Sequence, residues 1–337
     1  MASFSVLFGI WFYSRGSIFS TFRQANIDQS FLHFGTTPIP TASSSQYAVA
    51  IFLGKWWDEK DSDGDDIDSY YVAARTLVYQ LLYAPETKFT SPVSVVILAT
   101  EAVRESKRQR LRADGAIVVD TERLNHSLEI GVAQYREVFD KLRAFDPTVM
   151  PFEKVALIDA DMVVTRPLDA LFQDTNTTLS PVDNSKLPAA DLPELPDSYT
   201  FAATPDIPAR KQIFPPDVDN EWHRDYFNAG VMLSSPNDKL FQYYLAILAQ
   251  PDIFGHMWPE QDLLNFAHRW DGPMPWRQLN LSWHLKPPLE VDVDAGMAML
   301  HCKYWESGED SCHRISRARR WQMQGFWEGI ERKNIRA

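Results

Sequence analysis

Two carboxylates stand at the end of an apolar run in the middle of the chain. Residues 155–161, VALIDAD, place Asp159 and Asp161 on either side of Ala160. Carboxylates beside a core are costly unless a cation or hydrogen bonds compensate them. Hard carboxylate oxygens suit Mg²⁺ or Mn²⁺, which complete their shells with water and substrate phosphate. The pattern predicts a divalent-metal site for a phosphate-containing substrate; the alternative is that one aspartate caps a turn while the other is solvated.

Geometry sets a condition on this metal site. In a regular strand, Asp159 and Asp161 would lie on the same face but about 6.6 Å apart along the strand. Their short side chains can hold one ion together only if the chain turns near Ala160. Residues 162–172, MVVTRPLDALF, contain Pro167 and make such a turn plausible.

The elements before the aspartates alternate between strand-like and helix-like patterns. Strands that are apolar on both faces, alternating with helices, indicate a parallel sheet covered on both sides. Ligands of open α/β sheets bind beyond the carboxyl ends of the strands, where the two aspartates lie. We expect strands at 46–54, 93–100, 115–124 and 155–161, with helices at 69–84, 105–114 and 135–145.

The rest of the chain completes one α/β domain. A strand is expected at 226–235, followed by helices at 238–248 and 260–270. Residues 174–219 are rich in Pro and Asp and predict a surface excursion or lid. We divide the chain into an N-terminal apolar segment with a Ser/Pro-rich stalk (1–45), a catalytic domain (46–312) and a basic, aromatic C-terminal helix or tail (313–337).

Charge limits the possible partners. The 337 residues include 45 acidic and 33 basic side chains, for a formal net charge of −12. A field of this sign repels phosphate backbones, so no nucleic-acid partner is expected. The basic residues of 313–333 fit an exposed helix face, with membrane or acceptor binding as the alternative.

Two features concern the compartment. The apolar N-terminus, MASFSVLFGIWFYSRGS, is too short to span a bilayer and resembles a weak signal or short anchor with weak membrane association. Sequons at Asn125, Asn176 and Asn280 add to an expectation of the secretory pathway, with the Golgi lumen favoured over the cytoplasm. Cys302 and Cys312 form either one disulfide or two thiols.

Several motifs in a fixed order resemble one enzyme family. Residues 141–172 carry a lysine, the D-x-D and R-P-L-D-x-L-F; YFNAGVML, PEQDLLN and MLHCKYW follow. This series resembles the family 8 glycosyltransferases, the glycogenin-like group, over residues 46 to 306. The resemblance implies a single GT-A type nucleotide-diphospho-sugar transferase domain, α/β, with a mixed, mainly parallel central sheet flanked by helices. It also implies a metal-dependent, retaining hexosyltransferase that uses a UDP-sugar and a glycan, protein or lipid acceptor.

The resemblance assigns roles to individual residues. Asp159, Asp161 and His301 would hold Mn²⁺ (or Mg²⁺) on the donor diphosphate. Glu260, Gln261 and Asn228 would face the donor sugar as catalytic residues; Gln261 can only stabilise or orient, whereas Glu260 could act as nucleophile or orient the acceptor hydroxyl. The donor-binding set is Lys141, Asp159, Ala160, Asp161, Asn228, Ala229, Gly230, Gln261 and Lys303.

The last motif departs from the family. Lys303-Tyr304-Trp305 follows His301 at once, where the family has a glycine and a later K-P-W. A catalytically silent nucleotide-sugar or glycan-binding relative is therefore one alternative. A D-x-D phosphohydrolase is a second alternative. In that class the D-x-D follows the first strand of the core domain, whereas here about three strands precede the aspartates. The acidic loop 56–71 is read as solvated, because an EF-hand register would end on Tyr70 instead of a bidentate Glu.

Overall fold

The computed structural model describes residues 45–54, 68–130, 135–187, 192–207 and 225–336. These residues lie in the compact unit that spans 41–337. The predicted N-terminal segment and stalk lie outside the described residues, apart from Ser45, and so does most of the acidic loop.

A seven-stranded sheet forms the centre of this unit, in the order β10-β8-β9-β4-β1-β2-β3. The pairs β1–β2, β1–β4, β2–β3 and β8–β10 are parallel, whereas β9 runs antiparallel to both of its neighbours. The predicted mixed, mainly parallel sheet is therefore confirmed. Its strands are β1 (Tyr47–Leu53), β2 (Val93–Thr100), β3 (Ile117–Thr121), β4 (Lys154–Ile158), β8 (Phe201–Pro205), β9 (Phe227–Ser234) and β10 (Arg277–Gln278).

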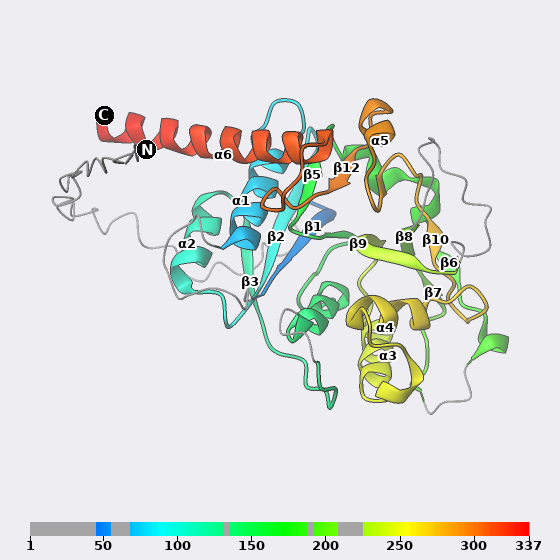
Figure 1. Ribbon diagram of the computed structural model, residues 1–337. Coiled ribbons are helices and arrows are strands. Elements are labelled where there is room, and N and C mark those ends of the chain that lie inside the picture. The colour runs from blue at the N-terminus through cyan, green and yellow to red at the C-terminus, as the bar shows by residue number, and fades with distance from the viewer. Residues whose placement is uncertain (1–44, 55–67, 131–134, 188–191, 208–224, 337) are drawn as a thin grey trace, which may run out of the picture. The chain divides into compact units, whose positions relative to one another are not determined.

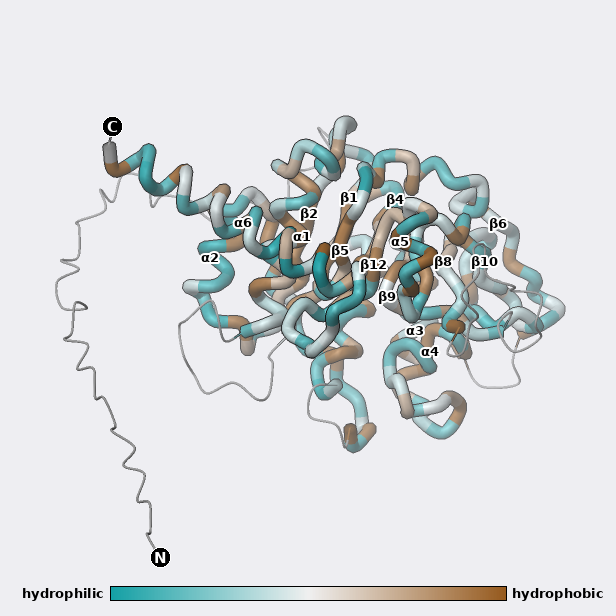
Figure 2. The backbone as a smooth tube through the Cα atoms, turned by 45° about the horizontal axis from the view of Figure 1, so that its top comes forward, coloured by the Kyte–Doolittle hydropathy of each residue, from teal (hydrophilic) through white to brown (hydrophobic). Residues whose placement is uncertain are grey.

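Helices cover both faces of the sheet (Figure 1). One face carries α1 (Ser69–Leu82), α2 (Glu105–Ala113) and α6 (Ser311–Arg336), and the other carries the 3₁₀ helix η3 (Val138–Phe145), α3 (Asp238–Leu248) and α4 (Pro259–Ala267). The alternation of β1 explains the two cores: Val49, Ile51 and Leu53 pack toward α1, while Ala48 and Ala50 pack toward η3 and α3. Figure 2 shows the apolar residues concentrated in these central strands.

A second, three-stranded sheet has the order β11-β12-β5. Its strands are β5 (Met162–Val164), β11 (His284–Leu285) and β12 (Met299–His301). β5 runs antiparallel to β12, and their register places His301 opposite Met162. This sheet brings a C-terminal histidine next to the aspartates that end β4. The remaining elements are β6 (Ser180–Pro181), β7 (Ser198–Tyr199), α5 (Glu290–Asp294), η4 (Asp169–Gln173), η5 (Thr175–Thr177), η6 (Asn184–Lys186) and η8 (Pro251–Ile253).

The structure corrects two expectations. Residues 201–205, predicted to lie in a surface excursion over 174–219, form β8, a fully buried strand between β9 and β10. The apolar run FAATP has only five residues and ends on a proline, so the surrounding Pro and Asp residues obscure it. Residues 188–191 and 208–219 of the same predicted excursion lie outside the described residues. The helix predicted over 135–145 is a 3₁₀ helix that begins at Val138.

The C-terminal segment is a long helix that packs against the domain. In α6, Met323 is buried, and the Phe326 ring lies against Tyr79 and Tyr83 of the α1 region. One side of the predicted basic helix is therefore core. The sulfurs of Cys302 and Cys312 form a disulfide between the end of β12 and the start of α6. Among the residues that the structure describes, no helix is both long and apolar enough to cross a bilayer.

A buried acid on η3 predicts a pH-dependent stability. Asp140 is 2% exposed and accepts a hydrogen bond from the Leu124 N–H at 2.7 Å. Burial raises the pKa of Asp140 to about 6, although that hydrogen bond and nearby arginines oppose the shift. Because the folded pKa exceeds the unfolded one, the charged form costs stability above pH 6, and this cost disappears as the pH falls toward 4.

We expect Asp140→Asn to raise the free energy of unfolding by about 1 kcal/mol at pH 7.5 and to lose that advantage near pH 4.5. Urea unfolding at the two pH values measures the difference. An equal effect at both pH values would show that the carboxylate charge is not what the substitution removes.

Candidate active site

The chain turns at Asp159, Ala160 and Asp161, between β4 and β5. The Met162 N–H donates to the carbonyl of Asp159 at 3.2 Å, and the Asp159 N–H donates to Gly230 of β9 at 2.9 Å. The Cys302 N–H, just after β12, donates to the carbonyl of Asp161 at 2.9 Å. Neighbouring strands therefore hold both ends of the turn, and the condition that the sequence set for a shared ion is met.

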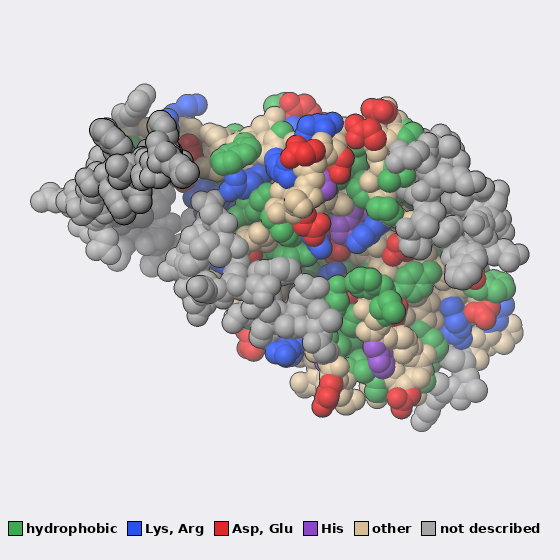
Figure 3. All heavy atoms as spheres, viewed as in Figure 1, with side chains coloured by type: hydrophobic (Ala, Val, Ile, Leu, Met, Phe, Trp, Pro, Cys, Tyr) green, Lys and Arg blue, Asp and Glu red, His purple; other side chains and the backbone are tan. Residues whose placement is uncertain are grey.

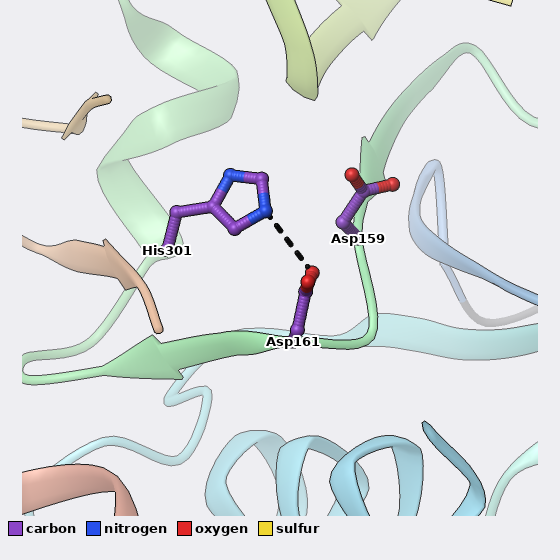
Figure 4. Close-up of side chains that lie close together, drawn as sticks. All are labelled: Asp159, Asp161 and His301. Atoms are coloured by element: carbon purple, nitrogen blue, oxygen red, sulfur yellow. Dashed lines mark ion pairs between the residues drawn. The ribbon is translucent and has the colours of Figure 1, made fainter. Parts of the chain in front are cut away.

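Asp159, Asp161 and His301 form a cluster of potential metal ligands. One ligand atom from each residue lies within 4.8 Å of the others, and His301 Nε2 lies 3.2 Å from Asp161 Oδ1. Figure 4 shows the imidazole pointing at the Asp161 carboxylate, with the Asp159 side chain beside them at the end of β4. Adjacent ligands of an octahedral ion at about 2.1 Å are separated by about 3 Å. The distance between His301 and Asp161 and the two-carboxylate, one-imidazole donor set are compatible with a divalent ion such as Mn²⁺ or Mg²⁺, and Asp159 lies near enough to join them.

Gly230 leaves the space that His301 occupies. A Cβ atom at Gly230 would lie 2.9 Å from His301 Nδ1, 2.8 Å from Asn228 Oδ1 and 2.7 Å from Met162 Cε. Contacts below 3.0 Å are not tolerated by real Cβ atoms. The sequence analysis gave Gly230 to the donor side of the site; in the structure its missing side chain also lets the β12 histidine approach the β4 turn.

The environment keeps Asp161 ionised. Its side chain is 5% exposed, and burial alone would disfavour the charged carboxylate. The adjacent His301, through its charge and its hydrogen bond, and then Lys303 and Lys286 outweigh burial and hold the pKa of Asp161 well below its ordinary value. An anionic, nearly buried oxygen is therefore directed into the cluster.

Lys141 connects the metal cluster to α4. Its Nζ donates to Asp159 Oδ1 at 2.7 Å and to Glu260 Oε1 at 2.8 Å. Burial alone would lower the pKa of Lys141, but the two carboxylates raise it well above its ordinary value. The lysine is therefore a permanent cation. It holds Glu260, which is 7% exposed, in a fixed position beside the aspartate turn.

Asp206, a residue that the sequence analysis missed, joins Asn228 and Gln261. Its Oδ2 accepts from Asn228 Nδ2 and from Gln261 Nε2, each at 3.2 Å. The oxygens of the two amides accept from backbone instead: Asn228 Oδ1 from Gly230 N at 2.9 Å and Gln261 Oε1 from Ala229 N at 2.8 Å. The orientation of both amides is thereby fixed. Asp206 directly follows β8, the strand hidden in the Pro/Asp-rich segment.

The start of α4 presents Glu260 and Gln261. Pro259 occupies the first helical position, where a missing N–H costs nothing. Asp262 accepts from the Trp258 N–H at 3.0 Å and from the Tyr226 hydroxyl. Asp262 therefore satisfies the backbone N–H of the N-cap residue Trp258 and holds the first turn of α4 in place.

One pocket contains most of the predicted residues. Asn228 and Gly230 do not line it. Its lining includes Lys141, Asp159, Ala160, Asp161, Ala229, Glu260, Gln261, His301 and Lys303. Figure 3 shows acidic, basic and histidine side chains gathered in the middle of this face of the molecule. The pocket also has lining residues that sequence reasoning did not select: Phe52, Leu53, Gly54, Tyr70, Tyr135, Glu137, Val138, Trp258, Pro259 and Lys286.

Comparison with solved structures defines the fold class. The bifunctional glycosyltransferase WbbM superposes on 85% of this chain with a TM-score of 0.52 and 16% sequence identity. The alignment covers 52% of WbbM, so this chain spans about half of its length. With the mixed sheet and the site at its carboxyl edge, the domain has the GT-A fold of glycosyltransferases.

Comparison of sequences gives the family. The chain matches no protein-family model. It is 34% identical over 263 residues to the uncharacterised protein C4C3.09 of Schizosaccharomyces pombe, an alignment that covers 71% of this chain and 69% of the relative. It is 30% identical over 279 residues to C5H10.12c of the same yeast, covering 72% and 70%. The chain belongs to the same family as these two proteins.

Proposed function

We propose that this protein is a metal-dependent, retaining glycosyltransferase of the glycogenin-like family 8, which transfers a hexose from a UDP-sugar to a glycan, protein or lipid hydroxyl. The observation that carries the proposal is the convergence of Asp159, Asp161 and His301 within 4.8 Å at the carboxyl edge of a GT-A sheet. The motif order that suggested the family also accounts for Lys141, Asn228, Glu260 and Gln261, which lie around this cluster.

The donor diphosphate is assigned to the metal cluster. Mn²⁺ or Mg²⁺, when bound, supplies Lewis-acid stabilisation of the charge that develops on the leaving diphosphate. Asp159, Asp161 and His301 would hold the ion. Lys286 and Lys303 line the same pocket and contribute positive charge toward the phosphates. This arrangement matches the transfer chemistry better than phosphate-ester hydrolysis, because the fold is shared with glycosyltransferases.

The donor sugar is assigned to the α4 side of the pocket. Glu260 is an oriented carboxylate because Lys141 donates to it at 2.8 Å. It is positioned to act on the acceptor hydroxyl or the anomeric carbon. The side-chain amide of Gln261 accepts a hydrogen bond from the Ala229 N–H and donates one to Asp206. Its role in the reaction is therefore to hold the pocket wall that faces the donor sugar in place.

Gln261→Ala is expected to lower kcat about tenfold to a hundredfold while changing the donor KM by less than threefold, because the lost amide orients the reacting centre and not the diphosphate. Steady-state kinetics with the preferred donor measure both constants. A large rise in KM with kcat unchanged would assign Gln261 to donor binding alone. Gln250→Ala, at the residue that precedes η8, serves as the matched control and should leave both constants unchanged.

A panel of nucleotide sugars tests the proposed function. The full chain is incubated with UDP-, GDP-, CDP- and ADP-hexoses, with Mn²⁺ or with a chelator, and the release of nucleoside diphosphate is measured. Metal-dependent release from a UDP-hexose, with retained anomeric configuration in the product by NMR, is the expected result. If no donor is turned over and none binds, the proposal is wrong; binding without turnover in the presence of varied acceptors would indicate a silent relative.

A further inference from the structure

The strand order assigns the two ends of the pocket to different parts of a donor. The metal cluster lies at the end of β4, and Gln261 and Glu260 lie on the β9 side of it. The opposite wall is formed at the end of β1, by Phe52, Leu53 and Gly54, together with residues that precede η3. If the diphosphate lies at the metal cluster and the sugar on the β9 side, the nucleoside must extend toward β1. This step rests on the proposed function.

A buried carboxylate stands at this nucleoside end. Glu137 is 8% exposed and lines the pocket. Its Oε2 accepts a hydrogen bond from the hydroxyl of Thr100, the last residue of β2, at 2.8 Å. A Cβ at Gly54 would lie 2.9 Å from the same oxygen, so the carboxylate lies directly over the end of β1. The carboxylate is held at the carboxyl edge of two neighbouring strands, and the described structure gives it no part in the metal cluster.

An aromatic side chain, Phe52, accompanies this carboxylate. Phe52 is half-buried and lines the pocket; Tyr135 also lines it, but its ring lies 6.0 Å from that of Trp258 at the start of α4. The Phe52 ring lies beside Gly54, where a Cβ would approach it at 3.3 Å. Aromatic faces bind any nucleobase by stacking, whereas an acceptor oxygen in the plane of the base discriminates among bases by their edges.

We propose that Glu137 is the base-selecting residue and that it accepts the imide N3–H of uracil. Cytosine carries an acceptor at N3, so a fixed carboxylate repels it. The resulting difference in binding free energy favours uridine over cytidine nucleotides. A hydrogen bond to an ionised acceptor is about twice as strong as a neutral one, and an unpaired or mismatched buried acceptor is costly. Thr100 fixes the carboxylate, and Gly54 leaves the space for it.

Binding of nucleoside diphosphates tests this assignment without any turnover. The affinities of the full chain for UDP and CDP are measured by calorimetry with saturating Mn²⁺, for the wild type, Glu137→Gln and Thr100→Val. The wild type is expected to prefer UDP at least about tenfold. The amide of Glu137→Gln can donate to cytosine N3 as well as accept from uracil, so the preference should fall to near unity. Thr100→Val, which keeps the carboxylate but removes its anchor, should reduce the preference by a smaller factor.

The controls separate this inference from the proposed function. Asp161→Asn should weaken UDP and CDP by the same factor and leave their ratio unchanged, because the metal cluster faces only the diphosphate. If Glu137→Gln weakens UDP and CDP equally, the carboxylate contacts ribose or structure and the assignment is wrong, while the proposed function stands. If the folded wild type binds neither nucleotide with Mn²⁺, the proposed function and the inference both fail.

Discussion

Asp161→Asn should lower metal-dependent turnover at least about a thousandfold while the protein remains folded. The substitution keeps the shape of the side chain but replaces a buried, anionic metal ligand by a neutral amide. Metal stabilisation of a leaving diphosphate is worth several kcal/mol, and each 1.4 kcal/mol is a factor of ten in rate. The backbone bond from Cys302 to the carbonyl of Asp161 does not involve the side chain, so the turn should persist.

A matched substitution controls for the chemical change itself. Asp271→Asn removes a carboxylate that is 60% exposed and paired with Arg269 on the surface, where ion pairs contribute little. Its turnover should equal that of the wild type. Circular dichroism and the thermal midpoint establish that both variants are folded. Retention of full Mn²⁺-dependent turnover in Asp161→Asn would refute the metal assignment.

Gly230→Ala should weaken Mn²⁺ affinity about tenfold to a hundredfold and lower turnover correspondingly. The added methyl group would meet Asn228 Oδ1 and His301 Nδ1 below 3.0 Å, and relief requires one of these groups to move. Displacement of groups that orient a metal ligand typically costs 10–100-fold in affinity. The terminal methyl group of Met162 can move away, so the steric strain falls on the Asn228 amide and on His301. The free energy of unfolding should fall by about 1–3 kcal/mol.

Gly325→Ala is the matched control for that substitution. Gly325 lies inside α6, and a Cβ there would have nothing within 4 Å. Because alanine is a better helix former than glycine, the free energy of unfolding of this variant should rise by about 0.5–1 kcal/mol. Its Mn²⁺ affinity should be unchanged. Normal metal affinity in Gly230→Ala would show that His301 does not depend on the space beside β9.

The interior parallel strands and the two aspartates of the metal cluster could be predicted from the sequence for physical reasons. Runs such as VSVVILAT and VALI are apolar on both faces, which is typical of buried parallel strands, and they became β2 and β4. Asp159 and Asp161 stand out because polar residues rarely interrupt such runs. His301 followed from motif order alone, since no local pattern reveals that β12 would pair with β5.

Other parts of the site depend on contacts distant in sequence. Asp206 acquires its role from β8, a strand too short to stand out among prolines and aspartates. Glu137 reads as one charge on an amphipathic helix, and only the fold places it against Thr100, 37 residues earlier. Lys141 was assigned to the donor, and the structure adds that it bridges Asp159 and Glu260. Pairings of this kind are set by strand order, which the sequence pattern does not specify.

We propose that Asp159, Asp161 and His301 hold a divalent ion to which a nucleoside diphosphate binds. Electron paramagnetic resonance of Mn²⁺ tests it directly, because the signal of aqueous Mn²⁺ disappears as the ion binds. We expect the wild type to bind one equivalent of Mn²⁺ in the presence of UDP, and the folded Asp159→Ala/Asp161→Ala variant to bind none. Equal Mn²⁺ binding by the two proteins, or none by the wild type with UDP present, would contradict it.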